Sequence, residues 1–428
     1  MREVRMYHRY FGVLLAALGT CVGFAGATGV PGFELIGAAY AQKPAANTVR
    51  PEIGKPIQAA LDLLKRKRAK SALAKVREAD SVTNKTPYEA YLVERVRGQV
   101  AAAAGNAVAA ARAFEATAAS SAVSGAERLQ FLAAAAGQYY LTKNYAKVVE
   151  ICARYFKDGG SDKAVRILYV QALYLGGDFA AAAKELLRDV RTEEQAGRMP
   201  PEAQLQLLAN AYLKQGDSLG YGSVLERLVT YYPKNEYWLA LIHTVAGARS
   251  GFSERLSLDL ARFRLATGTM RNAADYIEAA QLSLQAGLPA EATKIIDQGY
   301  AAGLLGAGPE SERHRRLKEM ANRNLAEDKK TLGQDDAAAA ELRDGTALLN
   351  AGLNYVLHGA GPKGLAMMTQ GFRKGGLKHP DDARLRLGYA YQLSGQKQKA
   401  IQMFKSVRAK DGTAALAHLW VLHLGRGG

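Results

Sequence analysis

Histidine and cysteine are the residue types that could support metal binding or nucleophilic catalysis in this chain of 428 residues. His418 and His423 are five positions apart, whereas two zinc ligands on one helical face are usually four apart. Cys152 lies in the apolar run KVVEICARYF, which is typical of a buried thiol. The sequence has no CxxCH haem motif, no GxSxG elbow and no phosphate-binding P-loop. We therefore expect a protein without catalytic residues, cofactor or metal; a glycan-cleaving enzyme with a helical superstructure is the enzymatic alternative.

Lysine and arginine could also bind a ligand, and they gather at the two ends of the chain. Residues 50–77 hold nine of them against two acidic residues, residues 362–428 hold twelve against three, and residues 78–361 hold 32 against 33. The densest run, KRKRAK, supplies a basic end patch of Lys65, Arg66, Lys67, Arg68 and Lys70. Clustered cations attract anionic lipid headgroups, anionic polysaccharide or an acidic protein, and they also serve as polar caps of a repeat array. Nucleic acid is disfavoured as a partner because the sequence contains no nucleic-acid-binding motif.

The first 41 residues have the pattern of a signal peptide for export. Three arginines precede an apolar segment at 11–27, and AYA at 39–41 precedes Gln42 as an A-x-A cleavage site. Removal of residues 1–41 leaves Cys152 as the single cysteine, so the mature chain can form no intramolecular disulfide. A long exported chain with so few cysteines is typical of the bacterial periplasm. An uncleaved N-terminus that anchors the protein in a membrane, or a lipid on Cys21, are the two alternatives.

The composition favours helices that pair as hairpins. Apolar residues make up 48% of the chain but aromatic residues only 8%, and alanine and leucine dominate. In the stretch LRLGYAYQLSGQKQKAIQMF at 385–404, Gly395 can take the left-handed conformation that ends a helix. Gly388 and Ala400 leave room where two antiparallel helices cross, and Phe404 fills the space beside the crossing. The stretch therefore predicts a helical hairpin.

The turn position of this hairpin recurs along the chain. The intervals are 38, 34, 39, 35, 36, 72 and 36 residues, and 72 is two units of 36. The positions are Gly105, Lys143, Gly177, Gly216, Gly251, Gly287, Gly359 and Gly395. Such a period predicts an array of repeated hairpins that stack to complete one core.

The hairpin and its period resemble the tetratricopeptide repeat (TPR), in which about 34 residues form one hairpin with small residues at the crossing. The residues that match its pattern include Gly98, Ala110, Phe114, Leu208, Tyr212, Gly352, Tyr355, Leu387, Gly388, Tyr391, Gly395, Ala400 and Phe404. Residues 238–268 fit the pattern loosely. The resemblance implies an all-α, right-handed α-solenoid of about nine or ten antiparallel helical hairpins, of the type found in exported bacterial TPR proteins.

We expect this array to begin after an N-terminal linker at 42–56 and to occupy residues 57–309. Residues 310–345 are charged and are either a degenerate repeat or an insertion. Residues 346–428 hold the C-terminal repeats, with a terminal capping helix at 414–424.

The resemblance also implies where a partner would bind, because the first helices of TPR hairpins line a concave groove. The residues one place beyond each crossing are Gln99, Gln171, Asn210, Gln281, Leu353 and Tyr389, with Tyr140, Tyr174, Lys214 and Gln392 one turn further on. Amides can bond both backbone groups of an extended peptide, and tyrosine supplies contact area at low entropy cost. The basic and asparagine clamp that some family members use for acidic C-termini is not visible. We expect a periplasmic scaffold that binds proteins or peptides; the alternative is an accessory factor for export or assembly of an anionic envelope polysaccharide, which contacts glycan or lipid through its basic ends.

Overall fold

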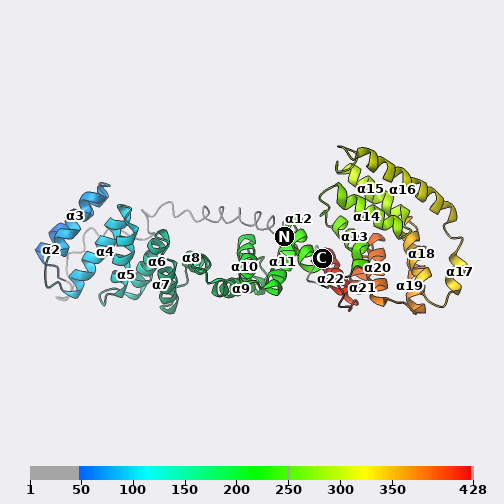
Figure 1. The fold of residues 1–428 in the computed structure, drawn as a ribbon. Coiled ribbons are helices and arrows are strands. Elements are labelled where there is room, and N and C mark those ends of the chain that lie inside the picture. Colours follow the sequence, from blue (N-terminus) through cyan, green and yellow to red (C-terminus); the bar gives the residue numbers. More distant parts are fainter. Residues whose placement is uncertain (1–47, 248–250, 426–428) are drawn as a thin grey trace. The chain divides into compact units, whose positions relative to one another are not determined.

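The computed structural model describes residues 48–247 and 251–425, and every regular element within these ranges is a helix (Figure 1). The predicted signal peptide lies outside the described residues. The chain divides into two compact units. Unit 1 comprises the described residues up to Arg198 together with Asn210–Gly216, and unit 2 comprises Met199–Ala209 and the described residues from Asp217 onward.

Unit 1 consists of consecutive helical hairpins. Its helices are α2 (Pro51–Lys65), α3 (Ala69–Asp80), α4 (Pro87–Ala103), α5 (Ala107–Ala119), α6 (Gly125–Leu141), α7 (Tyr145–Lys157), α8 (Lys163–Leu175) and α9 (Phe179–Gln195), followed by part of α10 (Glu202–Gln215). The first eight helices form four pairs, α2–α3, α4–α5, α6–α7 and α8–α9, and the two helices of each pair pack against each other. First helices of neighbouring pairs are also in contact, α2 with α4 and α6 with α8. This is the stacked arrangement that the 34- to 39-residue spacing predicts.

The N-terminal linker is shorter than predicted, because α2 begins at Pro51 rather than after residue 56. Ile53 is fully buried in the core of the first hairpin. The residue before the helix is also held, since the Arg50 guanidinium donates hydrogen bonds of 3.0 and 2.9 Å to the two carboxylate oxygens of Glu89 on α4. Packing and this ion pair together order the segment that composition alone marks as linker.

All eight predicted turn positions have a positive φ, which confirms the repeat period. The values run from 58° at Lys143 to 88° at Gly177. At Gly105 the chain closes the first helix with N–H bonds from Gly105 to Ala102 and from Asn106 to Ala101. The Asn106 side chain then accepts a bond from the Ala109 N–H and so caps the second helix. The same turn-and-cap pair recurs at Asn144, Asp178 and Asp217.

The predicted crossing glycines lie where paired helices approach most closely. A Cβ atom on Gly98 would lie 2.5 Å from the Phe114 ring, and one on Gly388 would lie 2.7 Å from the Phe404 ring. Both distances are shorter than any ordinary contact, so no larger residue fits unless the aromatic ring of the paired helix is displaced. The small residue and the aromatic residue of each hairpin are therefore a matched pair, as the sequence predicts.

Unit 2 contains the remaining helices. They are the first part of α10, α11 (Ser218–Tyr231), α12 (Asn235–Ala246), the short 3₁₀ helix η2 (Glu254–Leu256), α13 (Ser257–Ala266), α14 (Ala273–Gln285), α15 (Pro289–Ala301), α16 (Ser311–Thr331), α17 (Asp336–Glu341), α18 (Thr346–Leu357), α19 (Gly361–Lys374), α20 (Pro380–Leu393), α21 (Lys397–Lys405) and α22 (Thr413–Gly425). The charged segment predicted at 310–345 is the long helix α16 and the short helix α17, between the hairpins α14–α15 and α18–α19. Leu317 and Ala321 of α16 join the core of α14 and α15.

The last helix of unit 2 packs against its first helices. Helix α22, predicted as a terminal cap, contacts α11 as well as α20 and α21. The Trp420 ring lies 5.1 Å from the Phe263 ring of α13, and the His423 ring lies 5.8 Å from the Trp238 ring of α12. Unit 2 therefore closes on itself, whereas each repeat of an open solenoid contacts only its neighbours. Residues 238–268 depart from the repeat pattern because they form this internal interface.

Candidate functional site

The predicted groove residues lie on first helices of the hairpins in both units. Unit 1 carries Gln99 on α4, Tyr140 on α6, Gln171 and Tyr174 on α8, and Asn210 and Lys214 on α10. Unit 2 carries Gln281 on α14, Leu353 on α18, and Tyr389 and Gln392 on α20. Their surroundings differ from residue to residue.

Helix α8 presents a row of exposed residues in which Gln171 is central. Ile167 is 45% exposed and Leu175 is 43% exposed. Gln171 is partly exposed and lies four positions from each, so the three side chains share one face of the helix. Large aliphatic side chains exposed in a row on a helix are unlike the scattered apolar residues of an ordinary surface.

The neighbouring helix α6 continues this surface. Leu141, two residues before the turn at Lys143, corresponds to Leu175 before the turn at Gly177, and it is 59% exposed. Gly137 corresponds to Gln171, and no atom lies within 4 Å of the place where a side chain on Gly137 would begin. Helices α6 and α8 are in contact. We call Gly137, Leu141, Ile167, Gln171 and Leu175 the α8 face.

Tyr174 and Asn210 are buried, which differs from their predicted groove positions. The Tyr174 ring packs edge-on against Phe179 of the paired helix α9, with ring centroids 5.2 Å apart, and burial raises the pKa of Tyr174. Tyr140 packs in the same way against Tyr145, with centroids 5.8 Å apart. These tyrosines close the turn ends of their hairpins. The more accessible Gln99 and Lys214 stay predictions as partner-binding residues.

In unit 2, Gln281 is exposed and lines a cavity of about 430 Å³ between α14 and α16. The other lining residues are Ile277, Leu317 and Met320, which are apolar, and Arg313 and Arg316. Leu353 is buried in the core and Gln392 is partly exposed.

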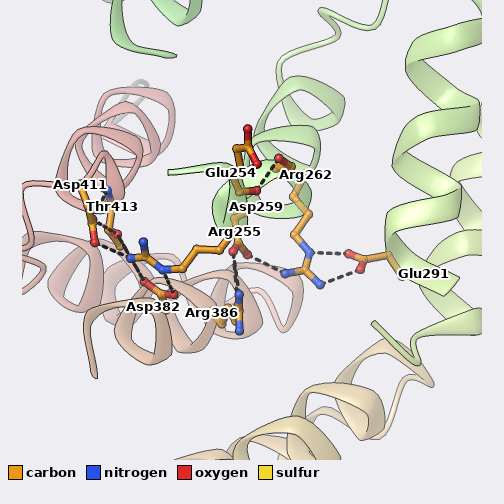
Figure 2. Close-up of polar contacts among 10 residues, drawn as sticks. Glu254, Arg255, Asp259, Arg262, Glu291, Asp382, Arg386, Asp411 and Thr413 are labelled. Atoms are coloured by element: carbon orange, nitrogen blue, oxygen red, sulfur yellow. Dashed lines mark hydrogen bonds and ion pairs between the residues drawn. The ribbon is translucent and has the colours of Figure 1, made fainter. Parts of the chain in front are cut away.

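The prediction that Tyr389 faces a groove is wrong. Its hydroxyl donates a hydrogen bond of 3.0 Å to a Glu291 carboxylate oxygen, and both residues are buried. The same carboxylate accepts bonds of 2.9 and 2.7 Å from the Arg262 guanidinium, which also donates one of 2.7 Å to Asp259 (Figure 2). Burial and the charge of Glu291 raise the pKa of Tyr389 well above its ordinary value. At Tyr389, the face of α20 that the register assigns to a partner instead contacts Arg262 of α13 and Glu291 of α15 in the same unit.

A second group of ion pairs continues this contact. Arg255 donates bonds of 2.8 and 2.9 Å to Asp382 on α20 and one of 2.5 Å to Asp411 (Figure 2). Thr413 donates to Asp411 at 2.6 Å, and this bond together with Arg255 lowers the pKa of Asp411 to about 2. Three arginines and four carboxylates thus join η2, α13 and α15 to the C-terminal part of unit 2: Arg255, Arg262, Arg386, Asp259, Glu291, Asp382 and Asp411. Sequence reasoning misses this cluster because its members are up to 156 positions apart.

The basic end patch lies at the turn between α2 and α3, and all five of its cations are exposed. Lys67 takes the left-handed conformation that ends α2, with φ of 58°. Lys65 lies 3.6 Å from Asp62, whereas the other four have no ion-pair partner among the described residues. At the C-terminal end, by contrast, Arg386 and Lys363 pair with Asp259 and Asp336 at 3.2 and 2.7 Å. Some of the basic residues in 362–428 therefore form ion pairs within the fold.

The side chains of His418, His423 and Cys152 make contacts that stabilise the fold. His418 pairs with Glu226 at 3.2 Å, whereas His423 lies against Trp238, Phe263 and Trp420. Cys152 is fully buried, and burial raises the pKa of its thiol to about 12. Within 48–247 and 251–425, no group of three or more His, Cys, Asp or Glu side chains could hold a metal ion. In the same ranges no helix has the length and apolar character needed to cross a membrane.

Comparison with solved structures gives likenesses that include two distant ones of helical-repeat proteins. No protein-family model and no curated protein matches the chain. The TPR2AB domain of yeast Sti1 in complex with pHSP90 is 13% identical, with a TM-score of 0.24, over 70% of this chain and 99% of that one. Naa15/Naa10 bound to HypK-THB is 14% identical, with a TM-score of 0.35, over 87% of this chain and 55% of that one. The assignment of the helical-repeat fold rests on the helices, turns and crossings described above.

Proposed function

We propose that this protein is a non-enzymatic helical-repeat scaffold that binds an extended segment of another protein along the α8 face. The observation that carries the proposal is the exposed row Ile167, Gln171 and Leu175 beside the open surface at Gly137. Ile167 and Leu175 are two helical turns apart, which is about 12 Å and matches about four residues of extended chain. Two apolar side chains of such a segment can contact the aliphatic residues while the Gln171 amide bonds the backbone between them.

An extended segment can reach exposed side chains on both helices of the α8 face. The exposed side chains lie on two neighbouring helices, with Leu141 at the position that corresponds to Leu175. A segment that runs along α8 from Ile167 to Leu175 can also contact Leu141 on α6 at its Leu175 end, so that both leucines are buried. The space above Gly137 leaves room for the backbone of the bound segment.

Site-specific photocrosslinking tests this proposal. A photoreactive residue at Gln171 should crosslink a partner polypeptide, and mass spectrometry of the adduct should identify one recurring apolar segment of that partner. The same residue at Arg191, exposed on the second helix α9, is the control and should give no such adduct. Ile167→Asp with Leu175→Asp should abolish the crosslink at Gln171. An adduct that forms equally at Arg191, or persists in the double variant, would contradict the proposal.

The location that we propose is the periplasm, and it rests on the signal-like pattern of residues 1–41. The mature protein should begin at or near Gln42 and should be released with the soluble periplasmic fraction. N-terminal sequencing of the protein from fractionated cells is the measurement. Retention of Met1 in the membrane fraction would favour the uncleaved anchor, and a lipid on Cys21 would favour the lipoprotein.

A second candidate function is assistance in the export or assembly of an anionic envelope polysaccharide. The observation that favours it is the exposed basic end patch, in which Arg66, Lys67, Arg68 and Lys70 have no acidic partner within the described part of the chain. Such a cluster would attract glycan carboxylates or lipid phosphates, and this attraction would weaken steeply with salt. Loss of binding to anionic glycan or vesicles on neutralisation of this turn would support the candidate.

A further inference from the structure

Helix α15 in unit 2 has one face that its neighbours leave uncovered. The first half of α16 packs on α14 and α15 through Leu317 and Ala321. Further along α16, Asp328 instead accepts hydrogen bonds from Asn354 on α18 at 3.0 Å and from His358, the residue that follows α18, at 2.5 Å. Between α15, α16 and α18 lies a cavity of about 560 Å³. This hollow is open to solvent, so a ligand bound in it would lie against the helices without being enclosed.

Polar side chains from all three helices line this cavity, over a floor of alanine and leucine. The polar residues are Thr293, Lys294, Asp297 and Gln298 on α15, Lys329 on α16, and His358 beyond the end of α18. The α15 residues follow the three- and four-residue spacing of a single helical face. Residues of three helices therefore form the walls of this cavity.

The charge of the lining is positive. Asp297 is neutralised by Lys318, which lies 2.7 Å away. Lys294 and Lys329, from two different helices, have no acidic partner among the described residues. Two ammonium groups without counterions, next to one neutralised carboxylate, favour a ligand that carries negative charge.

The hydrogen-bonding groups of the lining favour a ligand with hydroxyl groups. The Thr293 hydroxyl is inaccessible to bulk solvent and has no hydrogen-bond partner. A ligand in the hollow can supply the missing bond only when the Thr293 side chain rotates its hydroxyl toward the hollow, because water does not reach the oxygen in its present position. The Gln298 amide is exposed in the same wall and can both donate and accept. His358 is held by Asp328, so its ring has a fixed orientation in the lining.

We propose that this cavity is a binding site for a small, hydroxyl-rich organic anion, of the class of a sugar acid or a sugar phosphate. The cavity is larger than a bare phosphate ion needs, and its floor can contact the carbon faces of a sugar ring. The lysines supply the attraction for the carboxylate or phosphate, and Thr293 and Gln298 bond the hydroxyl groups. This site lies in unit 2 and does not depend on peptide binding at the α8 face in unit 1.

Isothermal titration calorimetry with the full mature chain tests the site. The probes are galacturonate and glucose 6-phosphate, which carry the two kinds of anion, with glucose as the neutral control and inorganic phosphate as the bare anion. We expect at least one sugar anion to bind about tenfold or more tightly than glucose and inorganic phosphate. Lys294→Gln with Lys329→Gln should weaken that binding by about tenfold or more. Lys163→Gln with Lys184→Gln, which removes the same charge from exposed lysines of unit 1, should leave it unchanged.

Thr293→Val separates a built site from charge attraction alone. It keeps the shape and the charge of the lining and removes the unpartnered hydroxyl. We expect weaker sugar-anion binding in this variant and an unchanged affinity for inorganic phosphate, with the melting temperature retained. Equal binding of glucose and the sugar anions, unaltered binding in the double lysine variant, or no heat from either sugar anion at millimolar concentration would overturn the proposal.

Discussion

The Tyr389 hydroxyl donates a hydrogen bond to the Glu291 carboxylate, although 98 residues separate the two in the chain. Tyr389 lies on the face of α20 that an open helical array would offer to a partner, and Glu291 lies on α15. The bond therefore brings together helices that nearest-neighbour stacking would keep apart. In unit 2, helices of the same unit contact part of the face that an open array would offer to a partner, so we assign partner binding to unit 1.

Loss of the buried guanidinium at the centre of this contact should destabilise unit 2. Arg262→Met leaves the buried Glu291 carboxylate without a cation and Asp259 with Arg386 alone, which we expect to cost about 3–5 kcal/mol. Urea unfolding followed by tryptophan fluorescence is suitable, because both tryptophans, Trp238 and Trp420, lie in the core of unit 2. Lys330→Met, which breaks an exposed pair with Glu327, should cost at most about 1 kcal/mol. Equal unfolding midpoints for the two variants would contradict the claim that Arg262 stabilises unit 2.

The crossing of α20 and α21 should not accept a large side chain. Gly388→Leu would place atoms against the Phe404 ring, where even a Cβ would be 2.7 Å away, and overpacking of this kind costs about 1–3 kcal/mol. Gln396→Glu, in the turn of the same hairpin, should be nearly silent. Thermal melts of the two variants would be compared with the wild type. If the Gly388→Leu protein were as stable as the Gln396→Glu protein, the assigned register of α20 against α21 would be wrong.

The Asp411 carboxylate should make unit 2 sensitive to acid. Its pKa is lowered from 3.8 to about 2 in the folded protein by the Thr413 hydroxyl and by Arg255. A lowered pKa contributes stability that is complete above pH 3.8 and declines as the pH falls toward 2. Asp411→Asn should therefore lower stability at neutral pH and flatten its decline between these two pH values.

Denaturant midpoints measured by tryptophan fluorescence from pH 6 to pH 2 would show this difference. Asp335→Asn is a suitable control, because Asp335 has no hydrogen bond or ion pair through its carboxylate among the described residues. If Asp411→Asn declined as steeply as the wild type, the assigned partners of Asp411 would be wrong.

Local sequence pattern was sufficient to predict the hairpins. Left-handed residues such as Gly177 and Gly395, and the Gly388–Phe404 crossing, act within about 20 residues of each other, so a period in the sequence reports them directly. The asparagine or aspartate after several of these turns is an N-cap signal that was available in the same stretches, at Asn106 and Asp178 for example.

The candidate site was less predictable, because exposure depends on which helix covers which. Register places Tyr174 and Tyr389 near the groove, yet Phe179 packs against the first, and Glu291, Arg262 and Trp420 contact the second. Conversely, Ile167 and Leu175 look like core residues in the sequence and are exposed in the fold. The closure of unit 2 depends on pairs such as Arg255 and Asp411, and no period relates residues at that separation.

The most direct test of the central claim is the affinity of the chain for the partner segment identified by crosslinking, measured at about 0.05 and 0.5 M salt. Binding along the α8 face should survive the higher salt, because buried aliphatic and amide contacts are only weakly screened. Ile167→Asp with Leu175→Asp should abolish it, and neutralisation of Lys65, Arg66, Lys67 and Arg68 should leave the dissociation rate unchanged. Binding that disappears at 0.5 M salt, ignores the double variant and is lost when the basic end patch is neutralised would contradict the account.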